Sequence, residues 1–281
     1  MNRIVSGYDA GAAEYARYWA PVLRETAARL IAEVDANYRH HDRSDRPLRV
    51  LDVGAGTGTL AIAAAQRWPS AEIVASDAAA GMMGFAQARA EEDGVLDGRL
   101  SFVVGAADEL PLPNASIDVA VSSFVLQLVP DRLAALTEIR RILRPGGLFA
   151  YVTWLDRESR EPFPAAEEFD EAVYELNVEE PDDSDDSIAG DVRSPRSAAD
   201  ELRRAGFVRA SAREETLIYD WTMESYLAYK FDYDERSLLS VLDSAQRVQL
   251  ERSVRDRLSR LQPSGFRWHA PVVFARGSAP G

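Results

Sequence analysis

The pattern of apolar and polar residues changes along the chain. Between Pro21 and Val34, apolar residues recur every three or four positions, which predicts one face of an amphipathic helix. From Arg49 to Trp154, short apolar runs alternate with longer stretches of helical periodicity. After Trp154 this alternation stops, and residues 156–195 are acidic and contain prolines. The pattern indicates a helical lead-in, an alternating central region and a less regular C-terminal part.

The central region predicts strands and helices in turn. We expect buried strands at LRVLDVG, AEIVASD, RLSFVVG, IDVAVSS and GLFAYVTW, and helices over residues 59–68, 81–92 and 131–143. Strands that alternate with helices are typical of a parallel, doubly wound sheet with right-handed crossovers. The sequence therefore predicts an α/β fold.

The C-terminal part predicts a helix over residues 165–176, another over residues 197–205, and strands over residues 210–221 and 266–276. The stretch between these two strands, residues 223–261, is mostly helical in pattern. Two strands around a long helical connection indicate a sheet edge that is closed by an antiparallel hairpin. The connection is then expected to form a cap.

Composition and charge narrow the classes of function. The 281 residues carry a formal net charge of −14, which disfavours a nucleic-acid partner because lysine and arginine neutralise phosphates in such complexes. The apolar runs are too short to span a bilayer, and the N-terminal stretch lacks the apolar core of a secretory signal, so we expect a cytoplasmic protein. The absence of cysteine excludes a disulfide framework, a thiolate nucleophile and a cysteine-based zinc site.

No metal site is expected. The acidic run at residues 179–186 lacks the glycine and the glutamate that a calcium loop needs at its sixth and twelfth positions. We interpret this run as a solvated, mobile loop.

The stretch VLDVGAGTGTL, from Val50 to Leu60, joins the first strand of the central region to its first helix. Glycines in such a turn let the backbone bend tightly and approach a ligand closely. The dinucleotide fingerprint needs a glycine or alanine where this chain has Thr59, and the phosphate loop needs a lysine that the stretch lacks. Neither phosphate-binding interpretation fits.

Two carboxylates indicate what the loop binds instead. Asp77 ends the second strand, where an acidic side chain can accept hydrogen bonds from both ribose hydroxyls in doubly wound folds. Asp52 lies in the first strand just before the loop, where its charge would repel a phosphate and favour an ammonium or sulfonium group. The sequence therefore predicts a cationic ligand of the adenosine type.

Four stretches in order resemble the successive motifs of class I S-adenosylmethionine-dependent methyltransferases: VLDVGAGTGTL, IVASDAAAGMM, VVGAADELPLPNASIDVAVSSFVLQLVPD and LRPGGLFAYVTW. The resemblance covers residues 48–154 and is strongest to the small-molecule branch, which includes the ubiquinone and menaquinone biosynthesis methyltransferases. It implies a Rossmann-like, mostly parallel, seven-stranded sheet with an antiparallel last strand. It also implies S-adenosylmethionine as the cofactor and a small-molecule methyl acceptor.

On this basis we expect four parts in the chain. Residues 1–47 form a helical lead-in that serves as a lid, and residues 48–155 form the Rossmann-like cofactor-binding core. Residues 156–195 are an acidic insertion. Residues 196–281 complete the sheet and carry a helical cap over residues 223–262.

Carried over by position, the resemblance implies a set of cofactor contacts. Asp52 would meet the methionine amino group, and Asp77 would take the ribose hydroxyls. The other expected contacts are Gly54, Ala55, Gly56, Thr57 and Gly58 in the loop, Ala78 and Met82 beside the adenine, Ala106, Ala107 and Asp108 at the adenine edge, and Ser122 and Ser123 at the methionine end. Relatives often carry an aspartate where this chain has Ala106, so adenine selectivity is expected to rest on Asp108 or on backbone groups.

Aromatic residues are dense outside the alternating region, which favours an apolar acceptor pocket. The expected acceptor contacts are Tyr15, Tyr18, Trp19, Trp154, Tyr226 and Tyr229. Methyl transfer is an in-line displacement in which alignment supplies most of the catalysis, and a carbon or oxygen acceptor also needs a base. His269, Tyr18 or a carboxylate of the cap could be this base, and the sequence does not choose among them.

Other functions stay open at this point. A methyltransferase acting on protein or RNA and a catalytically silent S-adenosylmethionine-binding protein share the same motifs. The sequence leaves open the acceptor, the methylated atom and the choice between a monomer and a homodimer.

Overall fold

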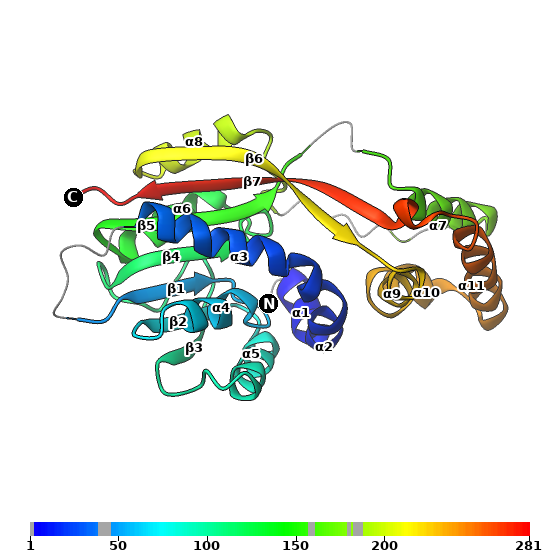
Figure 1. Ribbon diagram of the computed structural model, residues 1–281, viewed down its shortest axis with the longest axis horizontal. Helices are drawn as coiled ribbons and strands as arrows, with labels where there is room; N and C mark the ends of the chain where they lie inside the picture. Colours follow the sequence, from blue (N-terminus) through cyan, green and yellow to red (C-terminus); the bar gives the residue numbers. More distant parts are fainter. Residues whose placement is uncertain (1–2, 39–45, 157–160, 179–180, 182–187) are drawn as a thin grey trace.

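The computed structural model describes residues 3–38, 46–156, 161–178, 181 and 188–281. Its centre is a seven-stranded sheet in the order β3-β2-β1-β4-β5-β7-β6 (Figure 1). The strands are β1 (Arg49–Val53), β2 (Glu72–Asp77), β3 (Leu100–Val104), β4 (Ile117–Ser123), β5 (Leu143–Trp154), β6 (Val208–Asp220) and β7 (Arg267–Ser278). Strands β1 to β5 pair in parallel, whereas β7 is antiparallel to both β5 and β6. The predicted fold class, with its antiparallel last strand, is confirmed.

Helices cover both faces of the sheet. The helical segments are α1 (Arg3–Ala10), α2 (Ala12–Glu14), η1 (Tyr15–Trp19), α3 (Ala20–Asn37), α4 (Thr59–Arg67), α5 (Ala80–Glu92), α6 (Arg132–Ile142), α7 (Pro164–Glu175), α8 (Pro195–Arg204), α9 (Met223–Tyr229), η2 (Lys230–Asp234), α10 (Arg236–Val241), α11 (Ser244–Leu258) and η3 (Pro263–Phe266). Val50 and Val119 pack in one core with α3, α4 and α5, whereas Leu51 and Ala120 pack in a second core with α6 and α8. This two-residue alternation places helices on both faces and leaves the strand ends free for a site.

Two features of the fold differ from the sequence prediction. Strand β5 begins at Leu143, directly after α6, rather than at Gly147, because Leu143 already pairs with Ile117 before a bulge shifts the register. The expected helical stretch after β6 is broken into α9, η2, α10 and α11. The acidic run at residues 179–186 lies, apart from Pro181, outside the described residues.

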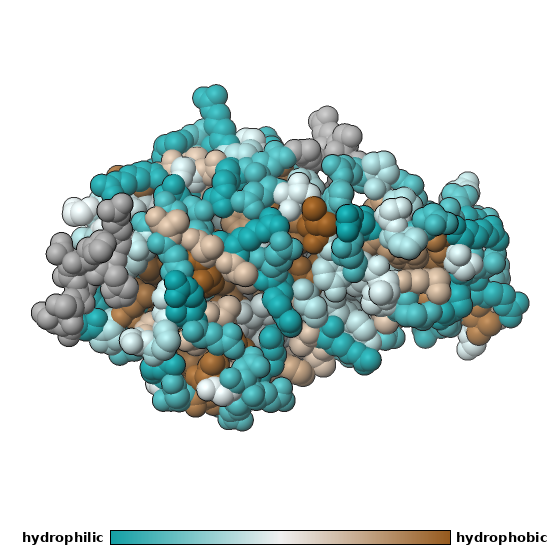
Figure 2. Space-filling model, viewed as in Figure 1, coloured by the Kyte–Doolittle hydropathy of each residue, from teal (hydrophilic) through white to brown (hydrophobic). Residues whose placement is uncertain are grey.

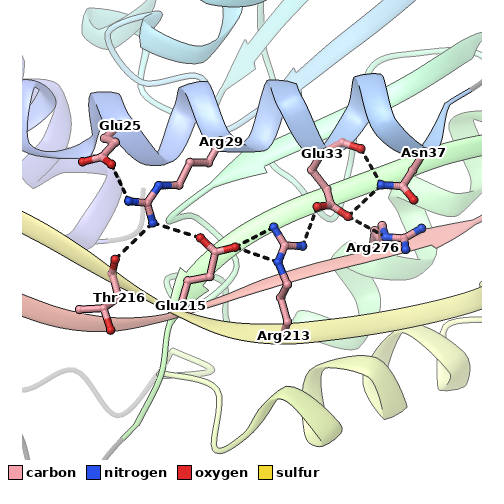
Figure 3. Close-up of polar contacts among 8 residues, drawn as sticks. All are labelled: Glu25, Arg29, Glu33, Asn37, Arg213, Glu215, Thr216 and Arg276. Carbon is pink, nitrogen blue, oxygen red and sulfur yellow. Dashed lines mark hydrogen bonds and ion pairs between the residues drawn. The ribbon is translucent and has the colours of Figure 1, made fainter.

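A charged network fastens α3 across β6 and β7, as Figure 3 shows. Arg29 of α3 donates to Glu215 of β6 at 3.0 Å. Here α3 also supplies the acidic partner: Glu33 accepts from Arg213 of β6 at 2.6 Å and pairs with Arg276 of β7 at 2.7 Å. Because α3 follows η1 directly, this network also fixes the position of η1 and its aromatic residues at the sheet.

The helices α7, α9, α10 and α11 form a lobe at the end of the molecule opposite the C-terminus (Figure 1). Within the lobe, Arg257 of α11 pairs with Glu168 of α7 at 3.0 Å. Strand β6 is parallel to β5, so α9 follows it at the same sheet edge as the ends of β1, β2 and β4. Figure 2 shows polar side chains over most of the visible face, and no described helix is long and apolar enough to cross a membrane.

Candidate functional site

The strand order reverses at the neighbouring strands β1 and β4, so the loops that follow them diverge and leave a crevice. A cavity of about 320 Å³ lies there, which we call the central cavity. Segments that follow β1, β2, β3 and β4 line it, together with α1 and Tyr15. This is the place at which doubly wound sheets bind ligands.

The glycine loop is shaped by close contacts. Gly54, Gly56 and Gly58 have φ angles of 70°, 53° and 81°, in the left-handed region that favours glycine. A Cβ on Gly54 would lie 2.3 Å from Val125 Cγ2, and one on Gly58 would lie 3.0 Å from Ala86 Cβ. The loop therefore packs against the segment after β4 and against α5 in a way that larger residues would prevent.

Asp77 lies at the end of β2 and lines the central cavity. Its two carboxylate oxygens accept hydrogen bonds from the backbone nitrogens of Gly56 at 2.8 Å and Ala79 at 2.9 Å. Burial raises the pKa of Asp77, and the negative charge of Asp9 adds to this effect. The carboxylate is thus held at the cavity wall by the loop that it orders.

Asp52 is 1% exposed, and no side chain among the described residues donates to either of its carboxylate oxygens. Burial, reinforced by the negative charge of Asp77 and only partly offset by the backbone N–H of Ala61, raises the pKa of Asp52 to about 8. Asp52 lines a second cavity of about 40 Å³ beside the glycine loop. An unpaired buried carboxylate is costly, and a cationic donor is the group that would satisfy it.

Asp118 offers a comparison, since it also lies in the sheet and is 1% exposed. Arg46 donates to both of its oxygens at 2.6 Å, and Arg144 donates at 2.7 Å. Burial alone would raise the pKa of Asp118, but these arginines bring it down to about 2. Among the described residues, the fold therefore neutralises Asp118 with arginines and leaves Asp52 beside a cavity without a cationic partner.

Of the cofactor residues expected from the sequence, all but Gly58 and Ser122 line the central cavity or the smaller one. The Ser122 hydroxyl donates to the Val53 carbonyl at 2.9 Å and thus ties β4 to β1. Gly58 precedes α4 and lets it pack against α5. These two residues therefore shape the loop without lining either cavity.

The sequence did not predict that α1 lines the central cavity. Ile4, Val5 and Tyr8 line the central cavity, and Asp9 accepts a hydrogen bond from the Gly81 backbone nitrogen at the start of α5. The recurrence of apolar residues at positions 4, 5 and 8 was the available signal, although the helix is only eight residues long. Tyr15 completes this wall, and burial raises its pKa.

The expected acceptor residues fall in different places. Trp19 and Trp154 line a third cavity of about 210 Å³ with Trp268 and His269, which we call the tryptophan cavity. Tyr18 donates its hydroxyl hydrogen bond to Asp232 of η2. The remaining two, Tyr226 and Tyr229, pack with Trp221 in the cap. Tyr18 and these two tyrosines line none of the three cavities described.

Comparison with known proteins agrees with this geometry. Residues 50–147 match the family model described as a methyltransferase domain. The chain carries a class I methyltransferase domain. The domain begins in β1, includes the glycine loop and Asp77, and ends in β5. S-adenosylmethionine is the cofactor of this class, and the residues of the central cavity fit it.

Curated relatives share this methyltransferase domain. A malonyl-acyl-carrier-protein O-methyltransferase of Geobacter sulfurreducens is 34% identical over 57% of this chain and 56% of its own length. A ubiquinone/menaquinone biosynthesis C-methyltransferase of Methylobacterium nodulans is 39% identical over 37% of this chain and 41% of its own length. The chain thus spans about half the length of the curated relatives that it matches, or less.

Solved structures share the fold. The YcgJ protein of Bacillus subtilis has a TM-score of 0.54 and 20% identity, over 90% of this chain and 98% of that one. A phosphoethanolamine N-methyltransferase of Haemonchus contortus, in complex with S-adenosylhomocysteine, has a TM-score of 0.57 and 16% identity, over 97% of this chain and 58% of that one.

Proposed function

We propose that this protein transfers a methyl group from S-adenosylmethionine to a small, aromatic or apolar metabolite by in-line displacement. The observation that carries the proposal is Asp52, a buried carboxylate beside the glycine loop that no side chain in the described part of the chain neutralises. A cationic ligand of the adenosine type suits this charge and the ribose-accepting position of Asp77. A dinucleotide would bring a pyrophosphate toward the same negative charge.

Different residues would bind different parts of such a ligand. Asp52 would pair with the ammonium group and Asp77 would accept from the ribose hydroxyls. Ala78 and Met82 would flank the adenine, and Ala107 and Asp108 would meet its edge. S-adenosylmethionine, when bound, supplies an electrophilic methyl group on a sulfonium. The chain's task is to align the acceptor with that group and to exclude water, which can lower the barrier by about 7 to 11 kcal/mol.

The lobe of cap helices and the aromatic lead-in support a small acceptor. Trp19 of η1 stacks on Tyr229 of α9 with ring centroids 5.4 Å apart, so the lead-in and the cap meet at the carboxyl edge of the sheet. The two larger cavities near this contact are lined mainly by apolar and aromatic side chains, which suits a small apolar acceptor. The net charge of −14 is a second argument against nucleic acid.

The test is turnover of methyl-labelled S-adenosylmethionine with three acceptor pools from the same cells: small molecules, proteins and RNA. We expect label to enter the small-molecule pool. Label in protein or RNA would favour the alternative methyltransferase classes, and tight cofactor binding with no transfer to any pool would favour a silent binding protein. A cytoplasmic location and a monomeric or homodimeric state stay predictions of the sequence.

A further inference from the structure

The central cavity and the smaller cavity beside Asp52 share part of their walls. Asp77 lines the central cavity and not the smaller one, whereas Asp52 lines the smaller one and not the central cavity. Four residues line both cavities: Tyr15, Gly54, Gly56 and Ser123. These four residues, which we call the shared wall, therefore lie at the boundary between the space beside one carboxylate and the space beside the other.

The chemistry of S-adenosylmethionine fixes which of its groups meets the shared wall. The sulfonium lies between the ammonium end and the ribose, so a ligand that reaches both Asp52 and Asp77 brings its sulfur to the boundary between them. A sulfonium is a cation without an N–H or O–H group, and it cannot donate an ordinary hydrogen bond. An aromatic ring attracts such a cation through the negative charge of its face.

Tyr15 supplies the aromatic ring of the shared wall. A Cβ added to Gly56 would lie 3.9 Å from Cε1 of Tyr15, so the ring lies close to the glycine loop. Burial raises the pKa of Tyr15, and the negative charges of Asp77 and Asp52 add to this effect, so both carboxylates act on the same side chain. Among the described residues that line the two cavities there is no arginine, lysine or histidine to repel a cation.

The ring of Tyr15 is held by the lead-in and by the cap. Tyr8 of α1 meets it with centroids 5.8 Å apart and planes at 75°, and Tyr233 of η2 meets it at 6.3 Å and 72°. Both contacts have the edge-to-face geometry that aromatic pairs prefer. The preceding residue, Glu14, pairs with Arg236 of α10 at 2.9 Å. The ring is thus positioned before a ligand binds, which lowers the entropic cost of a contact with it.

We propose that the ring of Tyr15 contacts the sulfonium of S-adenosylmethionine and shifts the preference of the site toward this cation and away from S-adenosylhomocysteine, whose sulfur is neutral. This inference rests on the proposed function. It moves Tyr15 from the expected acceptor contacts to the cofactor contacts and makes it a specificity-determining residue. Asp52 and Asp77 also attract a positive charge, so the ring supplies one part of the preference. The consequence is that exchange of the spent cofactor for a charged one is favoured.

The test is calorimetry with three ligands that differ at this position: S-adenosylmethionine, S-adenosylhomocysteine and sinefungin, which carries a protonated amine in place of the methylated sulfur. We expect Tyr15→Leu to weaken the binding of both cations by about fivefold or more beyond its effect on S-adenosylhomocysteine. Tyr15→Met, a second variant without a ring, should change the affinity ratio in the same way. Tyr15→Phe keeps the ring and should hold the wild-type ratio within about twofold.

Two control variants accompany this titration. Met82 lines the central cavity and is not part of the shared wall, so Met82→Ala should weaken all three ligands by the same factor. Trp68→Ala should change no affinity, because Trp68 lines none of the three cavities described and hydrogen-bonds Asp35. A ratio of affinities is also independent of the fraction of each variant that is folded.

The outcomes separate this inference from the proposed function. Wild-type protein that binds none of the three ligands contradicts the proposed function. Wild-type protein that binds them, together with an unchanged affinity ratio in Tyr15→Leu and Tyr15→Met, contradicts the role of Tyr15 alone. The same change of ratio in Met82→Ala, or its appearance in Tyr15→Phe, would also overturn the ring contact. Sinefungin that follows S-adenosylhomocysteine across the variants would show a contact with the methyl group rather than with the charge, and would overturn it too.

Discussion

The ring centroids of Phe124 and Trp154 lie 4.0 Å apart with the planes tilted by 33°, and Phe124 lines the central cavity whereas Trp154 lines the tryptophan cavity. Phe124 has a φ of 55°, which is uncommon for a residue with a Cβ, and its backbone nitrogen donates to the Val152 carbonyl at 2.9 Å. Neighbouring strand pairing thus holds an unfavourable backbone conformation at the point where two cavities meet. Residues in such conformations often serve a function.

Trp154→Ala should therefore impair turnover more than cofactor affinity. The indole is an expected acceptor contact and lines the tryptophan cavity, whereas most of the expected cofactor contacts line the central cavity or the smaller one. Steady-state kinetics with the acceptor pool and calorimetry with S-adenosylmethionine give the two quantities. Tyr226→Ala should show the same ratio if the cap closes over the acceptor, and Trp68→Ala should change neither. Equal losses of turnover and cofactor affinity would contradict an acceptor role for either residue.

Cofactor selectivity should favour S-adenosylmethionine and S-adenosylhomocysteine over NAD. Asp77 would accept from a ribose of all three ligands, but no charged side chain on the glycine loop would neutralise a pyrophosphate, and Asp52 would repel it. Titration calorimetry with the three ligands measures this directly. Tight NAD binding without a response to S-adenosylmethionine would contradict the cofactor assignment.

Asp77→Asn should weaken S-adenosylmethionine binding and keep the fold. A charged hydrogen-bond acceptor typically contributes about 1.5 to 3 kcal/mol, and the amide retains one acceptor for the Gly56 or Ala79 nitrogen. Calorimetry gives the affinity and circular dichroism the fold. Asp97→Asn, at an exposed site before β3, is the control. Unchanged affinity in Asp77→Asn would mean that the ribose binds elsewhere.

Cofactor affinity should rise with pH up to about 8. The raised pKa of Asp52, about 8, means that the unliganded protein is largely protonated there at pH 7, while a cationic ligand prefers the ionised form. Binding therefore releases a proton, and affinity increases by at most about tenfold per pH unit below that pKa. Calorimetry in buffers of different ionisation enthalpy counts the released proton.

Asp52→Asn separates this effect from the raised pKa of Asp77. The variant should bind more weakly and release less proton. Because the folded pKa of Asp52 lies above its ordinary value, ionising it destabilises the fold as pH rises from about 4 to about 8. Asp52→Asn should thus melt above the wild type at pH 9 and nearer to it at pH 5. The reverse order at pH 9 would show that the carboxylate is satisfied within the fold.

Hydrogen exchange should report closure of the lead-in and cap. We expect η1, α7 and α9 to α11 to gain protection when S-adenosylmethionine and an acceptor are both present, because a roof must open for entry and close to exclude water. The core should change mainly around the glycine loop and Asp77. Equal exchange of these helices in every state would show that they are not a lid.

The sequence by itself determined the sheet and the loop. Alternation of strand and helix patterns placed β1 to β4 within a residue or so at each end, because buried parallel strands need continuous apolar runs. The three glycines and the two carboxylates were also visible, since their roles follow from position relative to a strand end. In both cases the information is local: each element depends on residues within its own segment.

Only the tertiary structure decided which aromatic residues share a cavity. Trp19, Trp154 and Trp268 lie in three segments, and η1 reaches β5 and β7 because α3, which follows it, buries its apolar face and pairs through Arg29 and Glu33 with β6 and β7. The same packing turned Tyr18 toward Asp232 and placed His269 beside Glu161. Side-chain contacts between distant segments depend on how helices cross a sheet edge, and no periodicity within a segment encodes that crossing.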